Sequence, residues 1–468
     1  MRFGEIVLIL LVATLLIALW IPFVARKMRQ LPWRDALPVT LALVTAGQIF
    51  IEGYRWQMLP VYLLVSLLIV ALYVVSLGDA RRWWQWGGLV LGTLLLGIAF
   101  VPPILIPVPD LPDPTGRYDI GTTSIHMIDE GREEIYGDNK GAAREFMVQI
   151  WYPAEEGVVG RPAPFLPNAA ESAETIAVRL DLPAFALGHA TLVNGNARLD
   201  VPVSSAEERY PLLVFSHGYE SLRGQSTTLM EELASHGYIV MSMEHTYGAS
   251  MTIFPDGRIE FLDPITLSGE GEAYDANARL LSSQWQGDIL YALDELALLN
   301  EAAEGAFAGK VDFERLGVFG HSTGGGTAVR TCQMIDCVAT VGLDAWFGPV
   351  PLEVIDAGAD APTFFFMSES WSSEKNTAWI DSFMGNSSAH TQWLTIADTA
   401  HYDFTDIPFL SPLTSTIGLS GEIDATRGNE IVRTYTLAFF DWHIKGGESG
   451  LFDGASEAFP EVTERMPK

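Results

Sequence analysis

Ser322 lies in the run Gly320-His321-Ser322-Thr323-Gly324, which matches the pattern G-x-S-x-G. The run follows the apolar stretch Leu316–Phe319 and precedes the helix-compatible stretch Gly326–Met334. A serine on a sharp turn between a strand and a helix projects its hydroxyl, and a glycine two positions to either side lets the two elements approach closely. The pattern therefore predicts a nucleophilic serine, against the alternative of a glycine-rich turn without chemistry.

A serine hydroxyl needs a base at neutral pH, and that base needs an acid to orient it. After a turn of this kind the acid comes next in the chain and the histidine last. Of the histidines that follow Ser322, His401 lies in a loop directly after the expected strand Gln392–Ile396. His390 precedes that strand and His443 falls within a helical pattern. We therefore predict His401 as the base.

Two carboxylates could orient His401. Asp344 directly follows the expected strand Ala339–Leu343, and Glu369 follows the expected strand Thr363–Met367. Both side chains would emerge at the carboxyl ends of parallel strands, which is where active sites of such sheets lie. The spacing alone leaves the two carboxylates nearly equal as candidates.

Acyl transfer also needs two backbone N–H groups that face the oxyanion as it develops. Thr323 directly follows the nucleophile and is the first predicted donor. Tyr219 is the second, because it follows His217-Gly218 at the end of the apolar strand that contains Leu213–Phe215. The alternative for this His-Gly pair is a turn that merely ends the strand.

The elements that must position these residues alternate between strands and helices. Helical patterns cover Thr227–His236 and Arg279–Asn300. This alternation predicts a doubly wound, mostly parallel α/β sheet over residues 109–468. The expected strands are Phe146–Tyr152, Leu212–Phe215, Tyr238–Met243, Arg315–Phe319, Ala339–Leu343, Thr363–Met367 and Gln392–Ile396.

Residues 1–108 have a different character, with four long apolar runs at Ile6–Ala25, Ala36–Ile51, Leu59–Leu77 and Trp86–Ile106. About 20 apolar residues cross a bilayer as a helix, so we expect about four transmembrane helices here. Lys and Arg gather in the first and third connectors, at residues 26–34 and 81–82. By the positive-inside rule the chain would be a multi-pass membrane protein whose domain 109–468 lies on the extracytoplasmic side.

Charge and cysteine content narrow the function further. The chain has a net charge of −30, and residues 109–468 hold 20 Lys/Arg against 54 Asp/Glu. Such an acidic domain is a poor partner for nucleic acid, because phosphate binding depends on clustered positive charge.

Cys332 and Cys337 are the only cysteines, and they would form either a short disulfide ring or two buried thiols. No metal-ligand spacing is present, and we expect neither metal nor cofactor.

These motifs together resemble a known family, the platelet-activating-factor acetylhydrolase-like branch of the α/β-hydrolase superfamily, of the secreted lipoprotein-associated phospholipase type. The resemblance covers most of residues 120–445. It rests on Phe215-Ser216-His217-Gly218, Leu233–Tyr238, Glu244-His245, Gly320-His321-Ser322, Leu343-Asp344-Ala345-Trp346, His401–Phe404 and Gly421–Asp424.

The resemblance implies an α/β-hydrolase fold in which Asp344, rather than Glu369, is the triad acid and Tyr219 and Thr323 are the oxyanion donors. It implies hydrolysis of phospholipids with short or oxidised acyl chains, through an acyl-enzyme on Ser322. Thr323 departs from the family, which has a bulkier aromatic residue there, and the secreted members lack the apolar segment 1–108. Two other functions stay open: a polyester or xenobiotic esterase, and a membrane protein whose hydrolase domain is a non-catalytic binding module.

Overall fold

The computed structural model describes residues 1–21, 24, 27–28, 30, 35–77, 82–371 and 373–465. The chain divides into two compact units. The first contains Met1–Asp110 together with the short segments Leu182–Val193 and Leu410–Leu413. The second contains Leu111–Asp181, Asn194–Phe409 and Thr414–Lys468.

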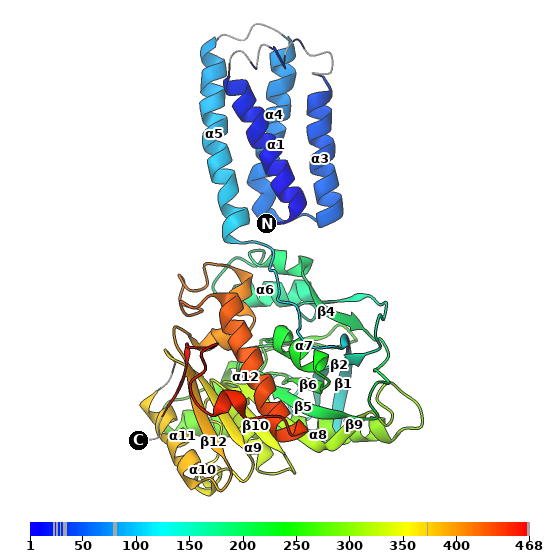
Figure 1. Ribbon diagram of the computed structural model, residues 1–468, viewed down its shortest axis with the longest axis vertical. Helices are drawn as coiled ribbons and strands as arrows, with labels where there is room; N and C mark the ends of the chain where they lie inside the picture. The colour runs from blue at the N-terminus through cyan, green and yellow to red at the C-terminus, as the bar shows by residue number, and fades with distance from the viewer. Residues whose placement is uncertain are drawn as a thin grey trace. The chain divides into compact units, whose positions relative to one another are not determined.

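The first unit is built on the helices α1 (Phe3–Trp20), α3 (Ala36–Glu52), α4 (Leu59–Leu77) and α5 (Arg82–Leu105), drawn in blue and cyan in Figure 1. Their apolar side chains pack on one another, and Leu8, Val12 and Leu64 are among those buried in this cluster. Arg55 and Glu5 form a buried two-point ion pair, with nitrogen–oxygen distances of 2.7 and 2.8 Å. Other apolar side chains of these helices are exposed, among them Leu10, Phe50 and Leu94.

Among the residues that the structure describes, no helix is both long and apolar enough to cross a membrane. The prediction of four transmembrane helices is therefore wrong, and so are the multi-pass membrane location and the extracytoplasmic placement that followed from it. The apolar runs do form helices, but a hydropathy pattern does not separate packing within a bundle from contact with lipid. The expected orientation also rested on connector residues such as Arg26, Arg29, Arg34 and Arg81, which lie outside the described residues.

The second unit contains an eleven-stranded sheet in the order β13-β12-β11-β10-β9-β5-β6-β2-β1-β4-β3. The six strands from β12 to β6 in this order pair parallel, while β6 with β2 and β2 with β1 pair antiparallel. The prediction of an α/β fold is confirmed, and the sheet is mixed: its central strands pair parallel, and antiparallel pairs lie toward both ends. The strand bounds are β1 Asp119–Glu133, β2 Ala143–Ala154, β3 Pro162–Pro164, β4 Asn194–Leu199, β5 Tyr210–Ser216, β6 Ile239–Glu244, β9 Val311–His321, β10 Ala339–Leu343, β11 Thr363–Ser368, β12 Thr391–Ile396 and β13 Val462–Glu464.

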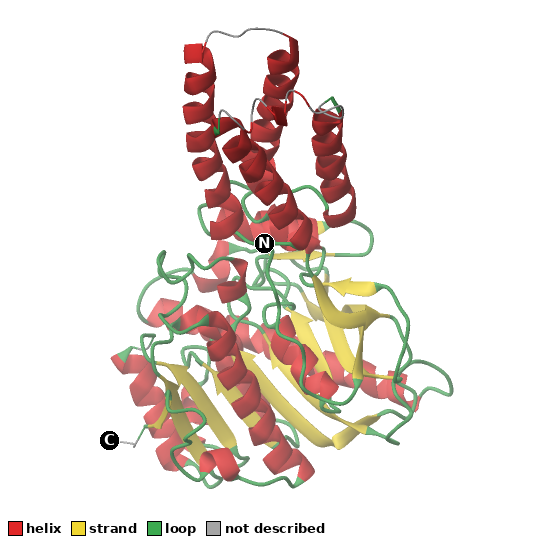
Figure 2. Ribbon diagram, turned by 45° about the horizontal axis from the view of Figure 1, so that its top comes forward, coloured by secondary structure: helices red, strands yellow, loops and turns green. Residues whose placement is uncertain are grey.

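Helices cover both faces of this sheet (Figure 2). The first face packs against α7 (Thr227–Ser235) and α12 (Ala425–Lys445), and the second against α8 (Glu272–Glu301), α9 (Thr323–Cys332), α10 (Leu352–Ala357) and α11 (Glu374–Asn386). The strand period of two produces this division, because alternate side chains point to opposite faces. On β5, Leu213 and Phe215 join the cluster under α7 and α12, whereas Leu212 and Val214 join the cluster under α8.

Two smaller features complete the second unit. The hairpin of β7 (Met251–Ile253) and β8 (Ile259–Phe261) follows β6, and α6 (Ala169–Arg179) precedes β4. Cys332 and Cys337 are joined in a disulfide with a Cα–Cα distance of 5.2 Å, so the structure decides between the two alternatives left by the sequence.

Candidate active site

Ser322 lies on the turn between β9 and α9. Its φ of 55° and ψ of −120° are strained for a residue with a side chain. Its N–H donates to Leu343 O at 3.0 Å, so the end of β10 holds the turn in place. A Cβ atom on Gly324 would overlap the carbonyl oxygen of Ser216, and one on Gly320 would overlap that of Gly324. Glycine at these two positions is what allows strand, turn and helix to approach so closely.

Asp344 and His401 meet at this end of the sheet. His401 Nδ1 lies 2.6 Å from Asp344 Oδ2, and the aspartate side chain is fully buried. The N–H of Ser368 donates to Asp344 Oδ1 at 2.8 Å, and its hydroxyl donates to both carboxylate oxygens at 2.9 and 3.0 Å. Every group that contacts the carboxylate is a hydrogen-bond donor, and these bonds stabilise its ionised form. Burial acts in the opposite direction and raises the pKa of Asp344 to about 7.

The other candidates lie elsewhere. Glu369 accepts a hydrogen bond from the N–H of Asp398 at 2.7 Å, and its carboxylate has no bond to His401 among the described residues. His443 is in α12 and packs edge-on against Phe439, with ring centroids 4.6 Å apart. The ring of His390 packs against Trp442. Of the two carboxylates that the sequence offered, the structure brings Asp344 to His401.

Two aromatic rings enclose His401. Trp371 stacks on it with centroids 4.0 Å apart and planes 21° apart, and His321 lies at a centroid distance of 4.5 Å. The Nε2–H of His321 donates to His401 O at 3.0 Å, which ties the histidine loop to the residue before Ser322. Burial lowers the pKa of His401 to about 3, so the ring is neutral near pH 7 and able to accept a proton.

No hydrogen bond joins Ser322 Oγ to His401 among the described residues. Both residues retain some exposure to solvent. Ser322 is 9 % exposed and the His401 side chain 17 %. In unliganded enzymes the bond between nucleophile and base is often long, and it tightens when substrate binds.

The loop after β5 lies directly beside the nucleophile. A Cβ atom on Gly218 would lie 3.4 Å from Ser322 Cβ. The N–H groups of Glu220 and Ser221 are bonded to Gly248 O and Gly218 O, whereas that of Tyr219 has no partner among the described residues. Thr323 is the first residue of α9, and the first N–H groups of a helix have no partner within it. Both predicted donor amides, those of Tyr219 and Thr323, are thus without a partner among the described residues, as an amide that receives an anion must be.

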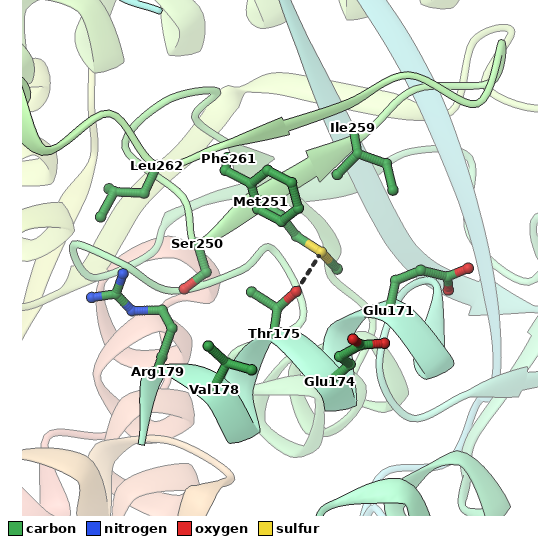
Figure 3. A pocket seen from close by; sticks show the side chains of 10 residues that line it. All are labelled: Glu171, Glu174, Thr175, Val178, Arg179, Ser250, Met251, Ile259, Phe261 and Leu262. Atoms are coloured by element: carbon green, nitrogen blue, oxygen red, sulfur yellow. Dashed lines mark hydrogen bonds between the residues drawn. The ribbon is translucent and has the colours of Figure 1, made fainter. Parts of the chain in front are cut away.

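A cavity of about 510 Å³ lies between α6 and the β7–β8 hairpin (Figure 3). Side chains of α6 face those of the β7–β8 hairpin across it, and Thr175 Oγ1 donates to Met251 Sδ at 3.1 Å. Arg179 pairs with the Glu220 carboxylate and Ser250 Oγ donates to Glu220 O, so two cavity residues hold the neighbour of Tyr219. The wall is mainly apolar with a few charged groups: Glu171, Glu174, Thr175, Val178, Arg179, Ser250, Met251, Ile259, Phe261 and Leu262.

Within the described part of the chain, no group of three or more His, Cys, Asp or Glu side chains is arranged to hold a metal ion.

Comparison with known protein families shows which family the chain belongs to. Residues 108–260 and 295–453 match the family described as platelet-activating factor acetylhydrolase, isoform II. The chain belongs to this family. The resemblance seen in the motifs is thereby confirmed, whereas the transmembrane segment expected beside it is not found among the described helices.

Individual relatives agree with this family. The chain is 27 % identical over 274 residues to a platelet-activating factor acetylhydrolase of Cavia porcellus, covering 53 % of this chain and 60 % of that protein. It is 24 % identical over 382 residues to a probable 1-alkyl-2-acetylglycerophosphocholine esterase of Arthroderma benhamiae, covering 75 % and 92 % of the two chains. A ferulic acid esterase from Streptomyces cinnamoneus has a similar structure, with a TM-score of 0.63 and 26 % identity over 77 % of this chain and all of that one.

Three residues of the site were not found from the sequence. Ser368 holds Asp344, Trp371 covers His401, and Asp403 accepts from the N–H groups of Ala400 and Gly421 at 2.7 and 2.6 Å. Ser368 ends β11 beside the end of β10, and this position at the carboxyl edge was the available signal. Trp371 gave none, since a loop tryptophan has no characteristic spacing.

Proposed function

We propose that this chain is a serine ester hydrolase that forms an acyl-enzyme on Ser322. Residues 109–468 would carry the activity, with Asp344 and His401 completing the triad and the N–H groups of Tyr219 and Thr323 binding the oxyanion. The observation that carries the proposal is the 2.6 Å bond between His401 Nδ1 and the buried Asp344, beside a strained serine turn.

The reaction follows from this geometry. Asp344 accepts the Nδ1–H of His401 and so fixes the tautomer in which Nε2 is free to take the hydroxyl proton of Ser322. Ser322 Oγ then attacks the ester carbonyl, and the two amides stabilise the tetrahedral oxyanion. His401 returns the proton to the leaving alcohol, and a water molecule activated by His401 hydrolyses the acyl-enzyme.

We propose phospholipids with short or oxidised acyl chains, or other small esters, as substrates. Relatives described as acetylhydrolases and as a 1-alkyl-2-acetylglycerophosphocholine esterase favour the lipid. The likeness to a ferulic acid esterase favours a small non-lipid ester as the second candidate. We further propose that the cavity between α6 and the β7–β8 hairpin receives the part of either substrate that does not react, because its wall is mainly apolar and two of its residues contact Glu220.

The test is covalent labelling with a fluorophosphonate followed by a substrate series. Wild-type protein should be labelled at one serine, and Ser322→Ala should not be labelled. Ser449→Ala should behave as wild type, because among the described residues that hydroxyl bonds only Asp453. A folded wild type that resists labelling would indicate a non-catalytic binding module. Hydrolysis of p-nitrophenyl esters without hydrolysis of short-chain phospholipid in mixed micelles would refute the lipid substrate and leave the esterase.

A further inference from the structure

A second Ser-His-Asp arrangement lies between the ends of β5 and β6 and helix α8, next to the donor loop. Ser216 Oγ is 2.9 Å from His245 Nε2, and His245 Nδ1 is 3.0 Å from Asp288 Oδ2. All three side chains are fully buried, so no ester can reach Ser216. The three side chains have the geometry of a catalytic triad, but substrate cannot reach them. Their role must therefore be structural, or act on the reaction indirectly.

The hydrogen-bond pattern fixes the state of His245. The Asp288 carboxylate can only accept, so His245 Nδ1 carries the proton and its Nε2 accepts from the Ser216 hydroxyl. His245 N–H in turn donates to His217 Nε2 at 3.2 Å. The ring stacks on Trp285 with centroids 4.4 Å apart and planes 6° apart, so it has no freedom to rotate.

Two arginine side chains bind the carboxylate of Asp288. Arg144 contacts both of its carboxylate oxygens, at 3.0 and 2.7 Å, and Arg132 contacts Oδ1 at 2.8 Å. Arg144 also pairs with Glu134 and donates to Thr246 O at 3.1 Å. Removing one partner from such a buried network leaves an uncompensated charge, so its members hold one another in a fixed arrangement.

Ser216 is the point at which this network meets the proposed site. Its carbonyl oxygen comes too close to Gly320 and Gly324 for either to carry a Cβ atom, so it packs against the turn of the nucleophile. The next residues, His217 and Gly218, begin the donor loop. Gly218 N–H is held by Gln225 Oε1 at 2.8 Å.

The loop after His245 holds the other side of the donor loop. Gly248 O accepts the N–H of Glu220, the residue after Tyr219, at 3.0 Å. Gly248 N–H is itself bonded to His245 O at 2.9 Å, and a Cβ on Gly248 would lie 2.6 Å from Trp285 Cζ2. His245 therefore reaches the donor loop on both sides of Tyr219, through Ser216 before it and Gly248 after it.

We propose that His245 is a positioning residue for ester hydrolysis, which aligns the Tyr219 and Thr323 amides by fixing Ser216 between them. The inference rests on the proposed function, because it assumes these two amides are the oxyanion donors. Asp288 and Arg144 set the tautomer and the position of His245, and neither they nor His245 touches substrate.

Two substitutions of His245 separate its two bonds. In His245→Asn the amide sits near the former Nδ1 and keeps the bond to Asp288, but Ser216 loses its acceptor. In His245→Gln the amide oxygen reaches the former Nε2 and can still accept from Ser216. We expect His245→Asn and Ser216→Ala to lower kcat by about ten- to one-hundredfold, less than the roughly 10²- to 10³-fold cost of deleting an oxyanion donor. His245→Gln should recover most of the loss.

The readouts distinguish positioning from stability. Turnover of p-nitrophenyl acetate is normalised to the sites that a fluorophosphonate titrates, so unfolded protein does not count. A positioning role lowers kcat with little change in KM, and the double variant Ser216→Ala/His245→Asn should lose no more than either single variant. Tyr152→Phe is the control, since it removes another buried hydroxyl bond, 2.8 Å to Val201 O, and should change Tm but not kcat.

Normal kcat per titrated site in both Ser216→Ala and His245→Asn would overturn the inference and leave a purely structural network. Additive losses in the double variant would also overturn it, because the two residues would then act separately. Hydrolysis that survives in Ser322→Ala would instead refute the proposed function, whatever the Ser216 and His245 variants do.

Discussion

Replacing Asp344 by Asn tests the triad acid, because the site around this side chain offers only donors. Its carboxylate accepts from Ser368 N–H, from Ser368 Oγ–H and from His401 Nδ1–H. The backbone N–H of Ser368 cannot change, so the single oxygen of an Asn amide stays on Ser368 and its NH₂ group faces His401. The ring must then accept at Nδ1 and carry its proton on Nε2, where it cannot take the proton of Ser322. The same change of tautomer costs roughly 10⁴ in kcat in the well-studied serine triad, and we expect a loss of that order.

The same substitution has a pH-dependent effect on stability. Burial raises the pKa of Asp344 from 3.8 to about 7, so between these values the native protein holds a proton that the unfolded chain releases. The carboxyl therefore costs the native state nothing below about pH 4, and it destabilises that state increasingly as the pH rises from about 4 to about 7, above which the effect is constant. Asn does not titrate. From pH 4 to pH 8 the free energy of unfolding should shift in favour of Asp344→Asn by up to roughly 4 kcal/mol, at 1.36 kcal/mol per pKa unit.

The measurements are turnover per titrated site and urea unfolding at pH 4, 6 and 8. Glu369→Gln is the matched control, because this carboxylate accepts from Asp398 N–H and should affect turnover little. A large loss of kcat in Glu369→Gln with normal turnover in Asp344→Asn would refute the reasoning about the acid. A stability difference that does not change with pH would refute the reasoning about burial.

Two further substitutions test the surroundings of the site, and a third, on α11, is their counterpart away from it. Trp371→Ala removes the ring stacked on His401, so water should reach the imidazole and raise its pKa from about 3 toward its ordinary value; the acid limb of the pH profile of kcat/KM should move to higher pH. Gly324→Ala places a Cβ on the Ser216 carbonyl and should destabilise the protein by about 3 kcal/mol or more. Gly385→Ala, at an exposed position of α11 with no atom within 4 Å, should instead stabilise it by about 0.5–1 kcal/mol in urea unfolding.

The strands that carry the site were predictable, because they contain short, largely buried apolar runs. β10 and β12 begin and end within one residue of the ranges expected from the sequence. The helix after Ser322 begins at Thr323, three residues before the expected start. The expected start was too late because Gly324-Gly325-Gly326 has poor intrinsic helix propensity. Close packing against Ser216 O and Trp346 O requires glycine there, and tertiary contact overrides the propensity.

Other parts of the fold gave no usable pattern. β1 contains charged residues and glycines along its length, and it is a strand because β2 pairs with it from Asp119 to Glu133. In the first unit, the pattern was read correctly as helical and wrongly as transmembrane. Long-range polar contacts are the hardest to anticipate: Asp288 lies 43 residues from His245, on a helix whose charge pattern resembles that of any solvated surface.

The chain thus contains two Ser-His-Asp arrangements, and their differences explain why only one of them suits catalysis. Ser322 has a strained backbone and reaches the surface, and two unpaired amides lie beside it. Ser216 is the last residue of a regular strand and is fully buried, and its hydroxyl donates a hydrogen bond to His245. The buried Asp288 is paired with arginine, which holds its pKa far below the usual range, whereas Asp344 has only neutral donors. An aspartate fixed permanently as an anion suits a rigid support, while Asp344 faces an imidazole that must gain and lose a proton in each cycle.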